Sequence, residues 1–210
     1  MLKIQNLSFS IEGKALFENA SAVIPRGHKV GIVGRNGTGK TTLFRLIRKE
    51  WEVDGGHIDV PENFSIGWVD QEASATNISL LDTVLAADRE RSRLLAELET
   101  KIDVDRIAHI HDRLIDIDSY SAEARAASIL SGLGFNQVAQ AKFCQEFSGG
   151  WRMRVALAAV LFAQPDLLLL DEPTNYLDLE GAIWLESFIA KYKHTVLVIS
   201  HDRTLLNRSV

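Results

Sequence analysis

The sequence lacks the multiple cysteines, the long apolar runs and the signal peptide that are typical of secreted and membrane proteins. Cys144 is the only cysteine among 210 residues, so no intrachain disulfide can form, and we expect a cytoplasmic protein. No apolar run approaches the ~20 residues that a membrane-spanning helix needs. No apolar stretch follows Met1–Gln5, as a signal peptide would require. The net charge of −5 disfavours non-specific nucleic-acid binding without excluding a local basic patch.

Three short apolar runs suggest the strands of a parallel sheet. They are Lys29–Val33, Leu167–Leu170 and Thr195–Ile199. None alternates with polar residues, which is typical of strands that helices cover on both faces. Helix patterns follow the first two runs, so the sequence predicts an α/β core with right-handed crossovers. A chain of 210 residues is long enough for one large domain, or for a core with one insertion.

The N-terminal region has a different pattern from this core. Leu7, Phe9 and Ile11 roughly alternate with polar neighbours, and Gly13 then ends the run. Alternation of this kind followed by a glycine is typical of half-buried antiparallel strands joined by a turn. We therefore predict an antiparallel β region that precedes the parallel sheet.

The middle of the chain is helical in pattern. From about residue 79 to about residue 144, leucine, isoleucine and valine recur at helical spacing. We interpret this stretch as a helical subdomain inserted into the α/β core. The core itself is then predicted to comprise residues 1–78 and about 145–210.

A glycine-rich loop follows the first predicted strand and opens a helix pattern. It fits G-x-x-x-x-G-K-[ST], and with the next threonine it comprises Gly34, Arg35, Asn36, Gly37, Thr38, Gly39, Lys40, Thr41 and Thr42. Glycines let the backbone wrap so that successive N–H groups face phosphate oxygens, at a helix N-terminus that favours anions. We expect Lys40 to neutralise the β- and γ-phosphates of ATP and Thr41 to ligate Mg²⁺.

Two adjacent carboxylates, Asp171 and Glu172, end the second predicted strand. The carboxyl end of a parallel strand faces the ligand crevice of such a sheet. We expect Asp171 to hold Mg²⁺ through water and Glu172 to polarise an attacking water. Taken alone, an acidic pair here could equally be a simple turn, but the phosphate-binding loop favours the catalytic interpretation.

Two further polar residues are candidates for the γ-phosphate end of the site. His201 follows the third predicted strand, near where the γ-phosphate should lie, although a lone histidine is more often structural. Gln71 could offer its amide oxygen either to Mg²⁺ or to the attacking water. We assign both residues a catalytic role, and Gln71 also a metal-binding one.

The motifs together resemble the ATP-binding cassette (ABC) family of P-loop NTPases. Ser148, Gly149 and Gly150 match its S-G-G signature, and Asp178 matches the aspartate of its D-loop. All the motifs occur in the family's order along nearly the whole chain. The resemblance implies that the signature forms a second anion-binding helix terminus. In the family, this terminus binds the γ-phosphate of ATP held by another domain, so two domains close head to tail.

Several details resemble the ABC-F subfamily, which lacks membrane domains. The stretches are F-S-G-G-W-R-M-R at 147–154, D-E-P-T-N-Y-L-D at 171–178 and S-H-D-R at 200–203. The resemblance implies an ATPase that acts on the ribosome and couples its nucleotide state to translation. The alternative is the ATP-binding subunit of a membrane transporter. A third possibility is that the isolated chain only binds nucleotide, because a complete site needs a second ABC domain, in the full-length chain or in a homodimer.

The chain departs from the family pattern in three respects. The family stacks adenine on an aromatic residue, and our register places Ile11 there, with Phe9 two residues earlier. The chain has one set of motifs and no charged linker, whereas ABC-F proteins have two ABC domains. It also stops soon after His201, where the family adds further strands. We expect it to be the truncated first domain of a longer protein.

Overall fold

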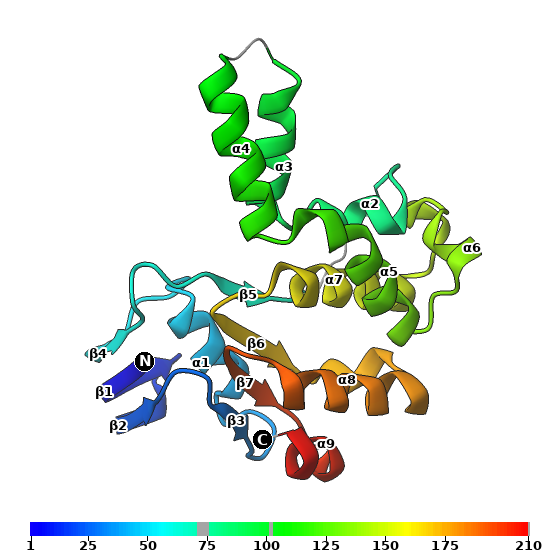
Figure 1. The fold of residues 1–210 in the computed structure, drawn as a ribbon. Coiled ribbons are helices and arrows are strands. Elements are labelled where there is room, and N and C mark those ends of the chain that lie inside the picture. The colour runs from blue at the N-terminus through cyan, green and yellow to red at the C-terminus, as the bar shows by residue number, and fades with distance from the viewer. Residues whose placement is uncertain (71–75, 101–102, 210) are drawn as a thin grey trace. The chain divides into compact units, whose positions relative to one another are not determined.

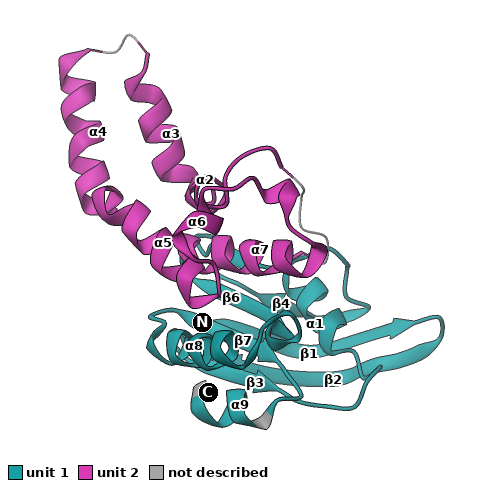
Figure 2. Ribbon diagram, turned by 90° about the vertical axis from the view of Figure 1, so that its right-hand side faces the viewer, with its two compact units in different colours: residues 1–69, 164–210 teal, residues 70–163 magenta. Residues whose placement is uncertain are grey.

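The structure is a computed structural model that describes residues 1–70, 76–100 and 103–209 (Figure 1). The chain forms two compact units, one of residues 1–69 and 164–210 and one of residues 70–163 (Figure 2). The first unit contains the sheets, and the second is helical. The predicted fold class, an α/β core with an inserted helical region, is confirmed. The predicted domain bounds came from motifs rather than packing, and they stay predictions.

The first unit contains a four-stranded parallel sheet in the order β3-β7-β6-β5. These strands are β3 (Lys29–Ile32), β7 (Thr195–Ile199), β6 (Leu167–Asp171) and β5 (Ile66–Trp68). All three predicted parallel strands are present, and every residue of β7 is buried. Because β7 pairs in parallel with both β3 and β6, the loops that follow these three strands leave from the same carboxyl end of the sheet.

The N-terminal residues form the predicted antiparallel region. Strands β2 (Lys14–Ile24), β1 (Leu2–Ile11) and β4 (Gly55–Asp59) pair in the order β2-β1-β4. Glu12 and Gly13 connect β1 to β2, with φ angles of 50° and 79°. Positive φ at both central residues is the requirement of a type I′ hairpin turn, so Gly13 ends the strand as predicted.

Helix α1 (Lys40–Ile47) is held by apolar contacts on two sides. Phe44 and Ile47 belong to a buried cluster that also contains Leu169 of the parallel sheet. Leu46 belongs to a second cluster, which contains Ile4 of the antiparallel sheet. Burial of each such side chain contributes roughly 1.5–3 kcal/mol. This packing fixes the start of α1, which carries the glycine-rich loop.

Three further segments complete the first unit. Strand β6 is followed by the 3₁₀ turn η3 (Pro173–Tyr176) and helix α8 (Leu179–Lys191), and α9 (Arg203–Ser209) follows β7. Leu206 of α9 approaches to 2.8 Å from the position that a Cβ at Gly31 would occupy. The glycine in β3 therefore allows α9 to lie close against the sheet.

The second unit contains the predicted helices. Helices α2 (Leu80–Leu85), α5 (Ala122–Gly132), α6 (Gln137–Gln140) and α7 (Gly149–Ala163) pack together, with short 3₁₀ turns at 119–121 and 144–146. Helices α3 (Arg89–Leu98) and α4 (Val104–Asp116) form a hairpin with its own small core of Leu94, Ile110 and Leu114. No helix in the described ranges is both long and apolar enough to cross a membrane.

Two ion pairs tie the α3–α4 hairpin together at its surface. Arg113 Nε donates to Glu90 Oε1 at 2.7 Å, and Arg106 Nε donates to Glu97 Oε1 at 2.6 Å. The hydrogen bonds from these guanidinium groups hold the pKa of Glu90 and of Glu97 below the usual value for a glutamate. Both pairs are solvated and screened, so they contribute little to stability.

Candidate active site

The glycine-rich loop between β3 and α1 closes around its own lysine. Lys40 Nζ donates hydrogen bonds to the carbonyl oxygens of Gly34 at 2.8 Å and Arg35 at 3.1 Å. Thr38 Oγ1 also donates to the Arg35 carbonyl, at 2.9 Å. Arg35 thus contributes its backbone to the loop, and the ammonium group lies at the loop's centre. A fixed cation beside a helix N-terminus is suited to a polyphosphate.

Gly39 is the position in this loop where a side chain is least tolerable. It caps α1 in the left-handed conformation, with φ of 92°. A Cβ there would lie 3.1 Å from Phe17 Cζ and 3.3 Å from Leu16 Cβ, both on β2. Only glycine combines this φ with such a close approach at low cost. Strand β2 of the antiparallel sheet therefore packs directly against the glycine-rich loop at Gly39.

Thr41 and Asp171 meet across 130 positions of sequence. The Thr41 hydroxyl, in the first turn of α1, donates to Asp171 Oδ2 at the end of β6, at 2.6 Å. A hydroxyl beside a carboxylate is an oxygen donor set that suits Mg²⁺. The described residues contain no group of three histidine, cysteine or acidic side chains that could hold a metal. Mg²⁺ bound mainly by phosphate and water oxygens needs no such group.

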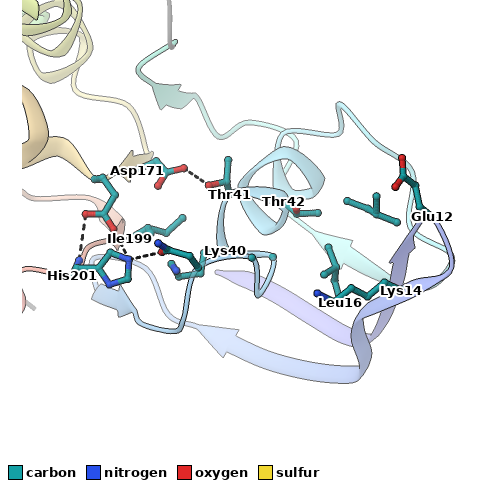
Figure 3. A pocket seen from close by; sticks show the side chains of 14 residues that line it. Glu12, Lys14, Leu16, Lys40, Thr41, Thr42, Asp171, Ile199 and His201 are labelled. Carbon is teal, nitrogen blue, oxygen red and sulfur yellow. Dashed lines mark hydrogen bonds and ion pairs between the residues drawn. The ribbon is translucent and has the colours of Figure 1, made fainter.

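Glu172 and His201 lie together at the ends of β6 and β7. The His201 backbone N–H donates to Glu172 Oε2 at 3.3 Å, and His201 Nε2 lies 3.4 Å from Oε1 (Figure 3). His201 Nε2 is also 3.1 Å from Asn36 Oδ1 in the glycine-rich loop. Glu172 adopts a left-handed φ of 48°, an uncommon conformation for a residue other than glycine.

One oxygen of the Glu172 carboxylate accepts no hydrogen bond from the described residues. Its Oε1 is buried and makes no hydrogen bond of good geometry within the described chain. The side chain as a whole is 22% exposed. A buried carboxylate oxygen without a hydrogen bond still has its capacity to accept one, and accepting a proton from water is what a general base must do.

Most of these residues line one pocket of about 580 Å³ within the first unit, and the loop residues Gly34, Arg35 and Thr38 are not in its lining. In Figure 3, Asp171 and His201 lie at one end, Lys40 and Thr41 in the middle, and Glu12, Lys14 and Leu16 at the other end. The complete lining is Ile11, Glu12, Lys14, Leu16, Asn36, Gly37, Gly39, Lys40, Thr41, Thr42, Asp171, Glu172, Ile199 and His201. The volume is in the range of small-molecule sites.

The two apolar β1 residues considered for the adenine position differ in their access to the pocket. Ile11 lines the pocket. Phe9 is only 8% exposed and stacks on Trp51, with ring centroids 5.7 Å apart. Phe9 is therefore part of the core and is unavailable to a base in the pocket. The sequence analysis missed Glu12, Lys14 and Leu16 as lining residues, although the turn at Gly13 could have indicated them.

Four other predicted residues, all described, are not among those that line this pocket. Ser148, Gly149 and Gly150 are exposed at the start of α7 in the helical unit, and a Cβ on either glycine would meet nothing. Asp178 accepts a hydrogen bond from the Gly181 N–H at 2.9 Å and so caps α8. Gln71 lies outside the described residues. The roles of these residues stay predictions.

The signature residues are supported from within the helical unit. The Trp151 ring packs edge-on against Phe135, with centroids 5.1 Å apart. The Arg154 guanidinium lies 4.3 Å from the centroid of the Trp151 ring and donates to the Leu133 carbonyl at 3.2 Å. These contacts hold the first turn of α7 against the segment that follows α5.

A nucleotide-binding α/β unit joined to a helical unit with an S-G-G helix start defines a class of ATPase domain. The ABC transporter family model matches residues 17–175, so the chain belongs to the ATP-binding cassette (ABC) family. The family resemblance of the motifs is confirmed. The fold agrees with a solved ATP-binding subunit of an ABC transporter, with a TM-score of 0.71 at 19% identity over 100% of this chain and 83% of that one.

Its relatives include a protein named as a member of ABC subfamily F. The chain is 47% identical to the probable ATP-binding protein YheS of Haemophilus influenzae, over 99% of this chain and 33% of that protein. It is 41% identical to ATP-binding cassette sub-family F member 3 of Mus musculus, over 98% of this chain and 30% of that protein. The chain thus spans about a third of the length of these relatives.

Proposed function

We propose that this chain binds Mg-ATP and hydrolyses it to ADP and phosphate, as one ABC domain of a longer ABC-F protein. The observation that carries the proposal is the 2.6 Å contact between Thr41 and Asp171. It joins the glycine-rich loop to the acidic end of β6 at the point where a metal would bridge protein and phosphate. Bound Mg²⁺ would neutralise developing charge on the phosphate oxygens.

Each residue of the site has its own role in the proposed hydrolysis. The loop amides and Lys40 hold the β- and γ-phosphates, while Thr41 and Asp171 orient the metal end. Glu172 Oε1, which lacks a hydrogen-bond partner among the described residues, accepts a proton from the attacking water. His201 lies against this carboxylate, with Nε2 3.4 Å from Oε1, and we expect it to contact the γ-phosphate. Gln71 offers its amide oxygen to the water or to the metal.

Hydrolysis requires a second ABC domain. We expect Ser148, Gly149 and Gly150 of one domain to cap the γ-phosphate held by the other, with Asp178 at the interface. Two observations support the capping role: Ser148, Gly149 and Gly150 are exposed, and they lie at the start of a 15-residue helix. A solved ATP-binding cassette dimer bound to ADP and Pi has the same fold, with a TM-score of 0.68 at 21% identity, over 100% of this chain and 91% of that one.

The ribosome is the partner that we propose for the parent protein. The relative named as an ABC sub-family F member is 41% identical to this chain over 98% of the chain. This relative favours the ABC-F role over the transporter alternative, as do Trp151 and Asn175, which lie in the stretches that resemble the ABC-F subfamily. With a non-hydrolysable ATP analogue, the full-length protein should sediment with ribosomes. Its absence from that fraction, with nucleotide binding intact, would contradict the ribosomal role.

Calorimetry with Mg-ATP tests the site itself. We expect wild-type protein to bind and Thr41→Ala to bind with a weakened dependence on Mg²⁺. Thr100→Ala, in the helical unit and outside the pocket, is the matched control and should bind like the wild type. Equal Mg²⁺ dependence in all three proteins would remove Thr41 from the metal site.

A further inference from the structure

The β1–β2 hairpin forms one end of the pocket, and its chemistry differs from that of the phosphate end. This hairpin end consists of Ile11, Glu12, Lys14 and Leu16. Among the described lining residues there is no phenylalanine, tyrosine or tryptophan. The base of a nucleotide whose phosphates occupy the loop would extend toward this end (Figure 3). Its ring would therefore meet two aliphatic side chains.

The nearby aromatic rings are occupied elsewhere. Phe9 stacks on Trp51, and the Arg45 guanidinium lies 5.0 Å from the centroid of the Trp51 ring. Phe17 packs where a side chain at Gly39 would stand, 3.1 Å from that Cβ position. Neither phenylalanine can turn into the pocket without breaking a contact that supports the sheet or the loop. The packing of these two phenylalanines therefore leaves Ile11 and Leu16 as the apolar side chains at the hairpin end of the pocket.

The turn also determines which side chains of the hairpin face the pocket. Ile11 and Lys14 are directly paired across the hairpin, on either side of the type I′ turn. Paired residues in an antiparallel ladder point to the same face, and Leu16 lies two residues further along that face. Apolar contact of this kind depends on the area buried and not on the pattern of ring atoms. It cannot tell one purine from another.

The two charged side chains at the tip of the hairpin, Glu12 and Lys14, also do not distinguish adenine from guanine. Glu12 can only accept hydrogen bonds when ionised, and Lys14 can only donate them. Adenine presents an amino donor and the N7 acceptor, whereas guanine presents amino donors and the O6 and N7 acceptors. One exposed acceptor beside one exposed donor, each on a flexible stem, can pair with either base edge.

We infer that this site selects its ligand by the triphosphate and accepts ATP and GTP nearly alike, with Ile11 and Leu16 as the base-contacting surface. The inference rests on the proposed function, because it assigns the base end of the same site. It extends the substrate class from ATP to GTP, because the hairpin end supplies neither an aromatic ring for stacking nor a fixed set of donors and acceptors that only adenine would match.

The test compares the binding of Mg²⁺ complexes of ATP, GTP and inorganic tripolyphosphate to the 210-residue chain by calorimetry. We expect the dissociation constants of ATP and GTP to agree within about threefold. Ile11→Tyr should tighten both nucleotides by about five- to tenfold, because any base can stack on an aromatic ring, and should leave tripolyphosphate unchanged. Val23→Tyr, on β2 and outside the pocket, should change none of the three.

A charge change at the tip sharpens the test. Glu12→Lys leaves only donors at the hairpin end, so it should shift the ATP-to-GTP preference about threefold toward GTP, whose O6 and N7 both accept. ATP bound more than tenfold tighter than GTP by the wild type would overturn the inference, as would Ile11→Tyr with no effect on nucleotides. Failure of all three ligands to bind would instead overturn the proposed function.

Discussion

The two ends of the pocket are built in different ways. The phosphate end brings together residues from the ends of β3, β6 and β7, joined by direct contacts such as Thr41–Asp171 at 2.6 Å and His201–Asn36 at 3.1 Å. The hairpin end comes from one local turn, and its side chains are aliphatic or exposed. Directional groups fix a ligand's chemistry, whereas apolar area only adds affinity. Specificity should therefore reside at the phosphate end.

Substituting one lysine at each end gives the largest expected contrast. Lys40→Ala should weaken Mg-ATP binding by roughly 30- to 1000-fold, because a charged group that pairs with phosphate in a closed loop is worth about 2–4 kcal/mol. Lys14→Ala should cost only about two- to threefold, since its ammonium group is exposed. Titration calorimetry measures both, with Lys193→Ala as a surface control. Comparable losses of Mg-ATP affinity in Lys40→Ala and Lys14→Ala would contradict the difference between the two ends of the pocket.

Glutamates at the two ends offer a second contrast, this time in turnover. Glu172→Gln should retain Mg-ATP and lower hydrolysis by about 10²- to 10⁴-fold, because glutamine cannot accept the proton. The assay needs a partner domain, so it uses the full-length protein and follows phosphate release. Glu12→Gln should change turnover by less than about threefold. A wild-type rate in Glu172→Gln would show that another group activates the water.

Two glycines with left-handed backbone provide the smallest contrast, in stability. Gly39 has φ of 92° and a crowded Cβ position, whereas Gly13 has φ of 79° and open space around it. Gly13→Ala should cost about 1–2 kcal/mol of unfolding free energy from the backbone alone. Gly39→Ala should cost about 1 kcal/mol more, because Phe17 must move. Urea denaturation measures both, and equal costs would mean that the loop is not packed on β2.

Much of the phosphate end was predictable from the sequence because its signals are local. The run Thr195–Ile199 is a strand with the predicted bounds, and the glycine-rich loop opens a helix at Lys40. Apolar runs and glycine spacing encode such features directly. That the loops after β3, β6 and β7 share one edge also followed, because parallel strands place their carboxyl ends together.

What the sequence did not reveal depends on contacts between distant residues. Phe9 is withheld from the pocket by Trp51, which lies 42 positions later, and no pattern around Phe9 indicates this. The His201–Asn36 contact spans 165 positions and needs the strand order to be known. Asp178 illustrates a competing role, because its side chain caps α8, a common task for aspartate at that position.

The central claim is that the glycine-rich loop, Lys40, Thr41 and Asp171 form one binding site for a metal-bound triphosphate. A crystal structure of the chain with a non-hydrolysable Mg-ATP analogue tests it most directly. We predict phosphates wrapped by residues 34–41, with the metal held by the Thr41 hydroxyl and facing Asp171. An analogue bound elsewhere, or a loop left empty at saturating ligand, would contradict the account.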